Sequence, residues 1–252
     1  MTADDPFRHH PGLRGKITPV DQSFFRDFTL DKMKATLAAE GLPIFSHYSD
    51  EEREELRAST LAARPDGPLW VFAYGSLMWD PALEFAEVRR ARLPGYARRF
   101  ILVDTLGGRG TPDQPGAMAA LDDGDHCSGL AFRIDEDIVD RETEILWRRE
   151  CIRPAYLPVF LPAETDHGSI MTLALIADHS SDMIEPELSR EAQIEHLATG
   201  TGFLGSSVDY LRGIVERFRI LGIEDQDAEA LLSAVEARIL ALAATSGTTP
   251  AE

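Results

Sequence analysis

The sequence predicts an α+β fold in which a small curled sheet or barrel is flanked by helices. Runs of β-branched and aromatic residues, typical of strands, cluster between residues 69 and 134 and resume at 156–178. Helical periodicity separates the two groups, and it returns after residue 188. Strands gathered together, with helices inserted and appended, are typical of α+β proteins.

The first 68 residues are predicted to form a helical extension that packs on the main domain. They are polar and favour helix, and Ser49 or Asp50 is placed to cap a helix. The sequence RPDGP at 64–68 is a turn signal that marks the boundary. The predicted organisation is an extension at 1–68, a main domain at 69–245 and a flexible tail at 246–252.

The main domain alternates between strand and helix patterns. The strand-like runs are LWVFAY (69–74), AEVRRARLPGY (86–96), RRFILVDT (98–105), GAMAALDD (116–123), SGLAFRI (128–134), YLPVFLPA (156–163) and SIMTLALIAD (169–178). The helical segments are DEDIVDRETEILWRRE (135–150), SREAQIEHLAT (189–199) and DQDAEALLSAVEARILAL (225–242). In the last of these, Leu232, Val235 and Ile239 recur at three- and four-residue steps, which predicts one buried face.

The composition argues against several classes of protein. The formal net charge is −18, whereas nucleic acids and anionic membranes need a basic surface, so neither partner is expected. The only two cysteines, Cys127 and Cys151, lack C-x-x-C spacing, which predicts a reducing compartment. No apolar run approaches the roughly 20 residues of a membrane span, and residues 1–12 lack the features of a signal peptide. A cytoplasmic protein is expected.

Three patterns that are typical of other enzymes are incomplete here. GTGFLG at 200–205 matches G-x-G-x-x-G, but a helical segment precedes it where a dinucleotide site requires a strand, so a helix end and turn are predicted. The seven histidines have no metal-ligand spacing, and no metal is expected. Ser76 lacks the second glycine of a G-x-S-x-G elbow, which argues against a serine hydrolase.

The apolar run WVFAYGSLMW at 70–79 is interrupted by Tyr74-Gly75-Ser76-Leu77. A glycine inside a strand permits another group to approach the backbone closely. The interruption is either a bulge or turn in a core strand, or a set of backbone N–H groups directed at an anionic or oxyanionic ligand atom. The pattern alone favours the bulge or turn.

Glu150 is a second candidate for function. On a helix it shares an apolar face with Leu146 and Trp147. Loss of hydration on such a face raises the pKa of a carboxyl group, and the dipole at a helix C-terminus acts in the same direction. The alternative is an ordinary ion pair with Arg148, Arg149 or Arg153, and the pattern alone does not decide between the two.

The sequence RGTPDQPG at residues 109–116 is a loop, and taken alone it predicts a surface turn. Together with other motifs, however, it resembles the ChaC-type γ-glutamylcyclotransferases, which cleave glutathione. The motifs are, in order, YGSLMW, GYARRF, RGTPDQPG, SGLAFRI, WRRE followed by a tyrosine, and GTGFLGSSVDYL. They extend over roughly residues 69–243 and agree with the family in order and approximate spacing.

The resemblance implies a γ-glutamylcyclotransferase-like fold, a small mixed β-barrel with flanking helices, and no metal or cofactor. The family's Y-G-S-L loop maps onto Tyr74, Gly75, Ser76 and Leu77, and its R-G motif maps onto Arg109 and Gly110. Its essential glutamate maps onto Glu150, and the tyrosine of its late motif maps onto Tyr210, with Ser207 where asparagine is common.

The resemblance also implies a reaction, in which the α-amine of a γ-glutamyl group attacks its own γ-carbonyl and expels the peptide amine. Glu150 would be the general acid/base, and the YGSL loop would bind the substrate carboxylate or the oxyanion. Arg109 would bind the glycyl carboxylate, while Tyr74 and Tyr210 would line the pocket. The expected reaction converts glutathione, a small-molecule substrate, to 5-oxoproline and Cys-Gly.

Two alternatives remain at this point. The enzyme could cyclise other γ-glutamyl amino acids or γ-glutamylamines instead. Outside the enzymes, the chain could bind a γ-glutamyl metabolite without turning it over, although a buried acid at position 150 argues against a pure binding module. No oligomeric state is predicted.

Overall fold

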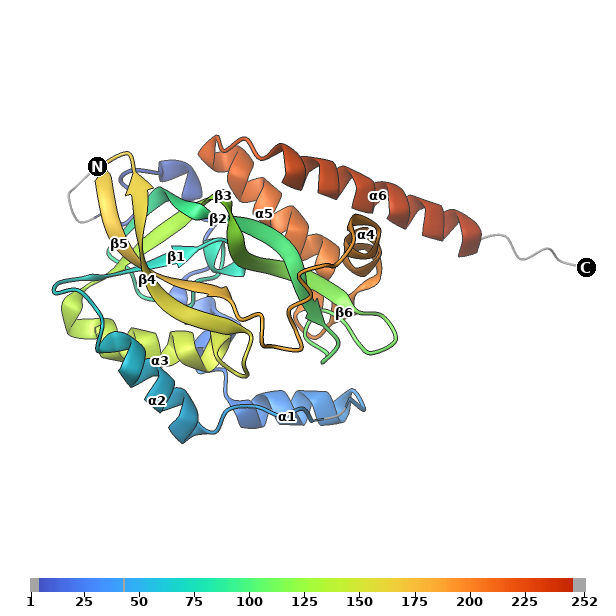
Figure 1. The fold of residues 1–252 in the computed structure, drawn as a ribbon, viewed down its shortest axis with the longest axis horizontal. Coiled ribbons are helices and arrows are strands. Elements are labelled where there is room, and N and C mark those ends of the chain that lie inside the picture. Colours follow the sequence, from blue (N-terminus) through green and yellow to red (C-terminus); the bar gives the residue numbers. More distant parts are fainter. Residues whose placement is uncertain (1–4, 43, 247–252) are drawn as a thin grey trace, which may run out of the picture.

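Five strands close into a barrel, and helices lie on two sides of it (Figure 1). The computed structural model describes residues 5–42 and 44–246. The strands are β1 Leu69–Ala73, β2 Glu87–Asp104, β3 Gly116–Ile134, β4 Tyr156–Thr165, β5 Gly168–Ala177, β6 Thr201–Gly202 and β7 Gly205–Ser206. The α-helices are α1 Leu30–Ala39, α2 Asp50–Leu61, α3 Val139–Glu150, α4 Arg190–Thr199, α5 Ser207–Leu221 and α6 Gln226–Ser246. The 3₁₀ helices are Pro11–Leu13, Val20–Gln22, Phe24–Asp27, Ser76–Met78 and Glu136–Ile138.

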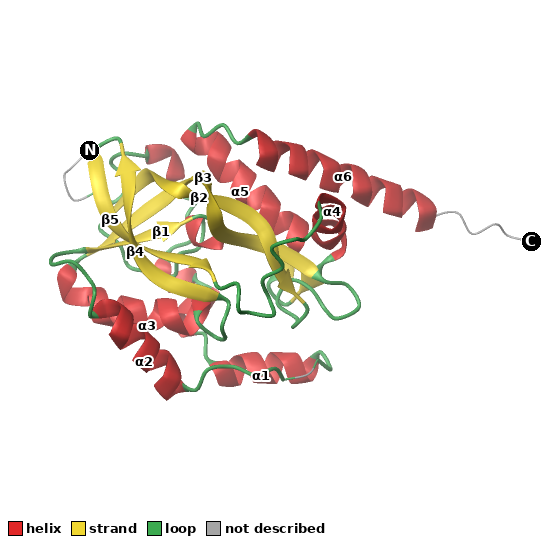
Figure 2. Cartoon of the chain, viewed as in Figure 1, coloured by secondary structure: helices red, strands yellow, loops and turns green. Residues whose placement is uncertain are grey.

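The barrel strands follow the order β1-β3-β2-β4-β5, and parallel pairing of β1 with β5 helps to close the circle. β1 runs antiparallel to β3, with Leu69 opposite Ile134 and Ala73 opposite Leu130. Every residue of β1 is buried, which is why this strand is an unbroken apolar run in the sequence. Figure 2 shows α5 and α6 on one side of the barrel and α2 and α3 on the other. The predicted α+β barrel with flanking helices is confirmed.

Four of the predicted strand segments, between residues 86 and 134, form only two strands, β2 and β3. The apparent break in β2 is a register shift between Pro94 and Tyr96. Gly95 lies there with φ 83°, in the left-handed region that glycine favours. A bulge bends a strand without ending it, so turn-forming residues inside a long strand gave a false boundary.

Helix α5 is absent from the sequence-based prediction, although it carries one of the predicted site residues, Tyr210. Its β-branched residues and the central Gly213 lower its intrinsic helix propensity. Tertiary packing overrides this tendency, because its buried residues recur at helical spacing against the core. The Ser206 side chain caps the helix start, and Gly222, with φ 62°, ends it.

Helix α2 of the N-terminal segment packs along α3. Ser49 caps α2 in a reciprocal capping box with Glu52, as the cap prediction required. Arg57 of α2 donates to Thr143 Oγ1 of α3 at 2.9 Å. None of the described helices is long and apolar enough to cross a membrane. Of the predicted tail at 246–252, residues 247–252 lie outside the described residues.

Candidate active site

A cavity of about 180 Å³ opens where β2 ends and β4 begins. Four of the seven predicted site residues line it: Ser76, Arg109, Glu150 and Tyr210. The remaining three, Tyr74, Gly75 and Leu77, do not. Side chains from the barrel, from α3 and α5, from the loop after β2 and from the N-terminal segment therefore meet at one place.

Glu150 is the last residue of α3, and its side chain is only 16% exposed. Its Oε1 lies 2.7 Å from Arg149 Nε, so the ion pair considered as an alternative is present. Burial nevertheless raises the pKa of the Glu150 carboxyl group, with a smaller contribution from Asp80, and Arg149 opposes the rise only in part. Both interpretations of the sequence therefore apply: Glu150 is paired with Arg149, and burial still raises its pKa.

Arg149 connects Glu150 to the YGSL segment. Its Nη2 donates to Ser76 Oγ at 3.0 Å, and its Nη1 donates to the backbone carbonyl of Asp80. Its guanidinium carbon lies 4.0 Å from the centre of the Phe25 ring, a cation–π distance. From the sequence, Arg149 is a possible ion-pair partner of Glu150 and the arginine that precedes the family's essential glutamate. The contacts make it the central cation of the site.

The YGSL segment is a turn that also permits a close approach. β1 ends at Ala73, and Ser76–Met78 form a 3₁₀ helix. A Cβ on Gly75 would lie 2.5 Å from the Tyr210 hydroxyl oxygen, so only glycine leaves room for that group. Within residues 5–42 and 44–246, nothing accepts a hydrogen bond from the backbone N–H of Ser76 or Leu77.

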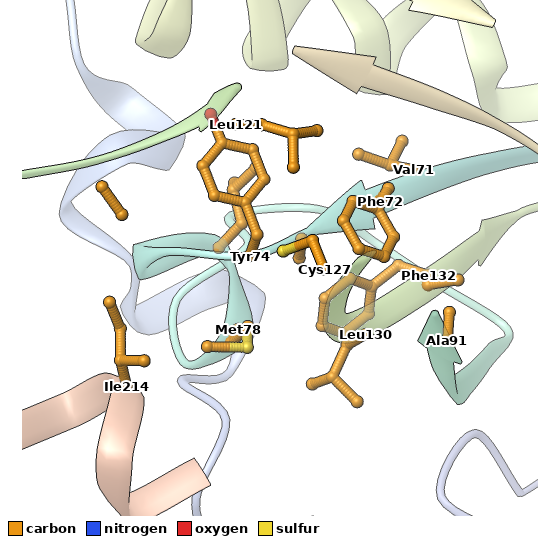
Figure 3. Packing of buried hydrophobic residues seen from close by; sticks show 14 of the residues in the cluster. Val71, Phe72, Tyr74, Met78, Ala91, Leu121, Cys127, Leu130, Phe132 and Ile214 are labelled. Carbon is orange, nitrogen blue, oxygen red and sulfur yellow. The ribbon is translucent and has the colours of Figure 1, made fainter. Parts of the chain in front are cut away.

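Tyr74 does not line the cavity, contrary to the expectation from the sequence. Its ring packs among buried residues inside the barrel (Figure 3). Its hydroxyl group donates to the backbone carbonyl of Leu175 at 2.9 Å. Tyr74 directly follows β1, a strand whose residues are all buried. Its side chain therefore continues into the core and does not reach the cavity.

The Gly75→Ala variant is expected to lose about 1–3 kcal/mol of unfolding free energy, because the buried Tyr210 has little freedom to move away. Chemical denaturation measures the loss. Gly12→Ala is the matched control, since its Cβ would lie an ordinary 3.4 Å from Ile220 Cγ2. Equal stability of the two variants would show that the Gly75–Tyr210 approach carries no constraint.

Two tyrosines face the region of Glu150. The Tyr210 hydroxyl oxygen accepts the Ala119 N–H at 3.2 Å, and burial raises the Tyr210 pKa to about 12. The phenol therefore keeps its proton at neutral pH and can donate it in a hydrogen bond. Tyr156, at the start of β4, also lines the cavity, and burial raises its pKa well above the usual value. In the sequence, Tyr156 is the tyrosine that follows the WRRE motif.

The loop after β2 holds Arg109 in the cavity wall. Asp104 accepts the backbone N–H groups of Leu106, at 2.8 Å, and of Arg109, and burial raises its own pKa. Arg109 Nη1 donates to the Ser206 carbonyl at 3.1 Å, and its guanidinium carbon lies 5.0 Å from the centre of the Tyr210 ring. Ser207, which occupies the position where asparagine is common, donates to the Arg109 carbonyl at 3.2 Å. The predicted surface turn is thus a wall of the site at its Arg109 end.

The GTGFLG segment forms a helix end and a tight hairpin, as predicted. α4 ends at Thr199, and β6 pairs with β7 directly afterwards. Helix α4, and not a strand, directly precedes Gly200, so the dinucleotide pattern is a coincidence of sequence. The hairpin tip supplies Phe203 and Leu204 to the cavity, and their N–H groups donate to the Gly107 and Gly108 carbonyls at 2.9 and 2.8 Å.

The site contains a protonatable carboxyl group, cations that can bind carboxylates, and a phenol that can donate a hydrogen bond. Across the described part of the chain, no group of three or more His, Cys, Asp or Glu side chains is arranged to hold a metal ion. Acid–base chemistry on a small substrate that carries carboxylates is what this set of side chains supports.

Similarities to known proteins agree with this geometry. The family model described as "ChaC-like protein" matches residues 69–238. The glutathione-specific gamma-glutamylcyclotransferase of Escherichia coli is 38% identical over 191 residues, which cover 75% of this chain and 82% of that protein. The glutathione-specific gamma-glutamylcyclotransferase 1 of Danio rerio is 30% identical, over a region that covers 69% of this chain and 89% of that protein.

The fold is shared with a solved structure. A crystal structure of a γ-glutamyl cyclotransferase specific to glutathione from yeast superposes with a TM-score of 0.61 and 20% sequence identity. The superposition covers 68% of this chain and 97% of that chain. At this identity the likeness shows the fold alone, and it confirms the fold expected from the sequence motifs.

Proposed function

Because the chain belongs to the ChaC-like protein family, we propose that it is a γ-glutamylcyclotransferase that cleaves glutathione to 5-oxoproline and Cys-Gly. The observation that carries the proposal is Glu150, a buried carboxyl group with a raised pKa beside the cavity. The names of the E. coli and Danio rerio relatives give the substrate.

The proposed reaction needs one group that first accepts and then donates a proton. Glu150 removes a proton from the α-ammonium of the γ-glutamyl group, and the free amine attacks the γ-carbonyl carbon. The new C–N bond closes the five-membered lactam, and the amide bond to cysteine breaks. Glu150 gives this proton to the leaving nitrogen, and the second proton, which the ring nitrogen loses as the lactam forms, passes by the same route to the released amine of Cys-Gly, so no water is consumed. Acid–base assistance of this kind is typically worth about 10²–10⁴-fold in rate.

The other cavity residues bind and orient the substrate in this proposal. The N–H groups of Ser76 and Leu77 and the Tyr210 hydroxyl group are the donors available to the substrate α-carboxylate or the oxyanion. Arg109 binds the glycyl carboxylate, the charge that lies farthest from the reacting carbonyl. Arg149 binds both Ser76 and Glu150, which fixes the acid/base residue relative to the YGSL loop.

The remaining expectations from the sequence complete the proposal. Residues 69–245 form the catalytic domain, and residues 1–68 form an extension. The enzyme acts in the cytoplasm, a location that suits the two free, buried cysteines, Cys127 and Cys151. Neither a nucleic acid nor a membrane is proposed as a partner.

Incubation of the purified protein with glutathione, without added metal or nucleotide, tests the proposal. Equal amounts of 5-oxoproline and Cys-Gly are expected by mass spectrometry. If glutathione is unchanged while γ-glutamyl amino acids or amines are cyclised, the substrate assignment is wrong and the reaction class is right. Binding of γ-glutamyl compounds without any product would instead indicate a binding module.

Arg109→Ala separates the candidate substrates. The KM for glutathione is expected to rise about tenfold or more, because a hydrogen-bonded charge pair is lost. The KM for γ-glutamylcysteine, which lacks the glycine, should change little. Arg92→Ala is the control, because Arg92 is 43% exposed and paired with Glu164 away from the cavity. An equal rise of KM for both substrates would rule out the glycyl carboxylate as the partner of Arg109.

A further inference from the structure

Part of the cavity wall comes from the N-terminal segment, which precedes the residues matched by the family model. Phe25, Met33 and Phe45 line the cavity from this segment. Met33 belongs to a small apolar cluster whose buried members are Phe28, Met33 and Leu37. Ile152 and Phe203 of the main domain pack against the same cluster. The extension is therefore part of the site and not a separate appendage.

A salt bridge fixes this segment to the helix that carries Glu150. Arg26 binds Glu142 of α3 through two contacts, of 2.5 and 2.9 Å. Glu142 is fully buried and also accepts the Glu84 N–H at 2.9 Å. Arg148 Nη2 donates to the Arg26 carbonyl at 2.9 Å. Because both the side chain and the backbone of Arg26 are tied to α3, the adjacent Phe25 has a defined place.

Phe25 covers Arg149. Its ring centre lies 4.0 Å from the guanidinium carbon, while the edges of that guanidinium donate to Ser76, Asp80 and Glu150. A planar cation bonded at its edges exposes its faces, and an aromatic ring excludes water from the face that it covers. The neighbouring Phe24, which is 54% exposed, packs edge-on against Phe25 with 5.3 Å between the ring centres.

We propose that Phe25 is a positioning residue of the active site: by capping the face of Arg149, it keeps water away from the Arg149–Glu150 pair. The extension thereby completes a site whose other parts belong to the family domain. The kinetic part of this proposal rests on the proposed function, since it assigns Phe25 to the same acid/base step.

The surroundings of Glu150 define what the loss of Phe25 changes. The titratable and charged groups that act on Glu150, or on which Glu150 acts, are Arg149, Asp80, Tyr74, Cys151, Tyr156 and Tyr210. Arg149 is the cation among them, and it keeps its bonds to Ser76 and Asp80 when the ring is removed. Water that enters in place of the ring therefore mainly relieves the burial of Glu150, and its pKa falls toward the ordinary value.

The test compares Phe25→Ala with Phe25→Tyr, which keeps the ring, and with Leu240→Ala, a change at a residue of α6 that is 72% exposed and does not line the cavity. For Phe25→Ala we expect kcat on glutathione to fall about tenfold, the size of a partly buried cation–π contact. The acidic limb of its kcat/KM profile should move to lower pH. Carbon-13 NMR titration of the Glu150 carboxyl group, assigned with Glu150→Gln, should show the same fall in pKa. Phe25→Tyr and Leu240→Ala should resemble the wild type.

The NMR titration needs no turnover, so it separates this inference from the proposed function. Wild-type protein that makes no 5-oxoproline would overturn the function, whereas an unchanged or raised Glu150 pKa in Phe25→Ala would overturn the role of Phe25. A rise in KM with kcat and the pH profile unchanged would also overturn it, since Phe25 would then only contact substrate. Thermal unfolding of all three variants confirms that each is folded during the measurements.

Discussion

Glu150→Gln is expected to lower the rate of 5-oxoproline formation about 10²–10⁴-fold, the range of a lost general acid/base. Glutamine keeps the shape of the side chain and an oxygen that accepts the hydrogen bond from Arg149, but it cannot exchange a proton at neutral pH. The fold should therefore survive while turnover does not. Product formation is followed by mass spectrometry, together with the thermal unfolding of the variant.

Glu144→Gln is the matched control for this substitution. Glu144 lies on the same helix, α3, is 64% exposed and pairs with Arg148. It should retain wild-type turnover. If Glu150→Gln unfolded instead of losing turnover, the carboxylate would be primarily a structural partner of Arg149. If it kept turnover, another group would have to be the acid/base.

Arg149→Met is expected to produce the second large effect. Removal of the cation leaves Glu150 buried without its partner, and a neighbouring opposite charge typically shifts a carboxyl pKa by about 1–3 units. The Glu150 pKa should therefore rise further above its ordinary value. Below the new pKa, each unit of rise lowers the ionised fraction about tenfold, so kcat/KM should fall most at acidic pH. A pH–rate profile measures this directly.

The direction of the shift distinguishes this variant from the others. Arg149→Met should move the acidic limb of kcat/KM to higher pH, whereas Phe25→Ala should move it to lower pH. Arg219→Met is the control, because Arg219 is 64% exposed, pairs with Glu229 and does not line the cavity. An acidic limb that stays in place in Arg149→Met would mean that Glu150 is not the group reported by the profile.

Much of the fold is predictable from local patterns because those patterns carry the packing directly. The unbroken apolar run of β1 and the periodic faces of α3 and α6 identify buried elements. Prediction failed where tertiary contacts override local preference. Gly95 suggested a strand end inside β2, and α5 contains residues that favour strands yet packs as a helix on the core.

The site was predictable only in part, for a related reason. Ser76, Arg109, Glu150 and Tyr210 stand in motifs, so the sequence alone brought them together as candidates. How much each of these residues contributes to the site depends on distances in the folded chain, which spacing along the sequence does not give. Tyr74 turns into the barrel, and Arg149 becomes the central cation. Phe25 packs on Arg149 although it lies more than a hundred residues before it in the sequence. Such contacts leave no local signal in a single sequence.

Glutathione turnover in H₂¹⁸O shows directly whether the γ-glutamyl group is released by its own amine or by water. Attack by the amine predicts 5-oxoproline that contains no ¹⁸O, together with an equal amount of Cys-Gly. Glutamate that carries ¹⁸O would contradict it, because that product arises when water attacks the γ-carbonyl.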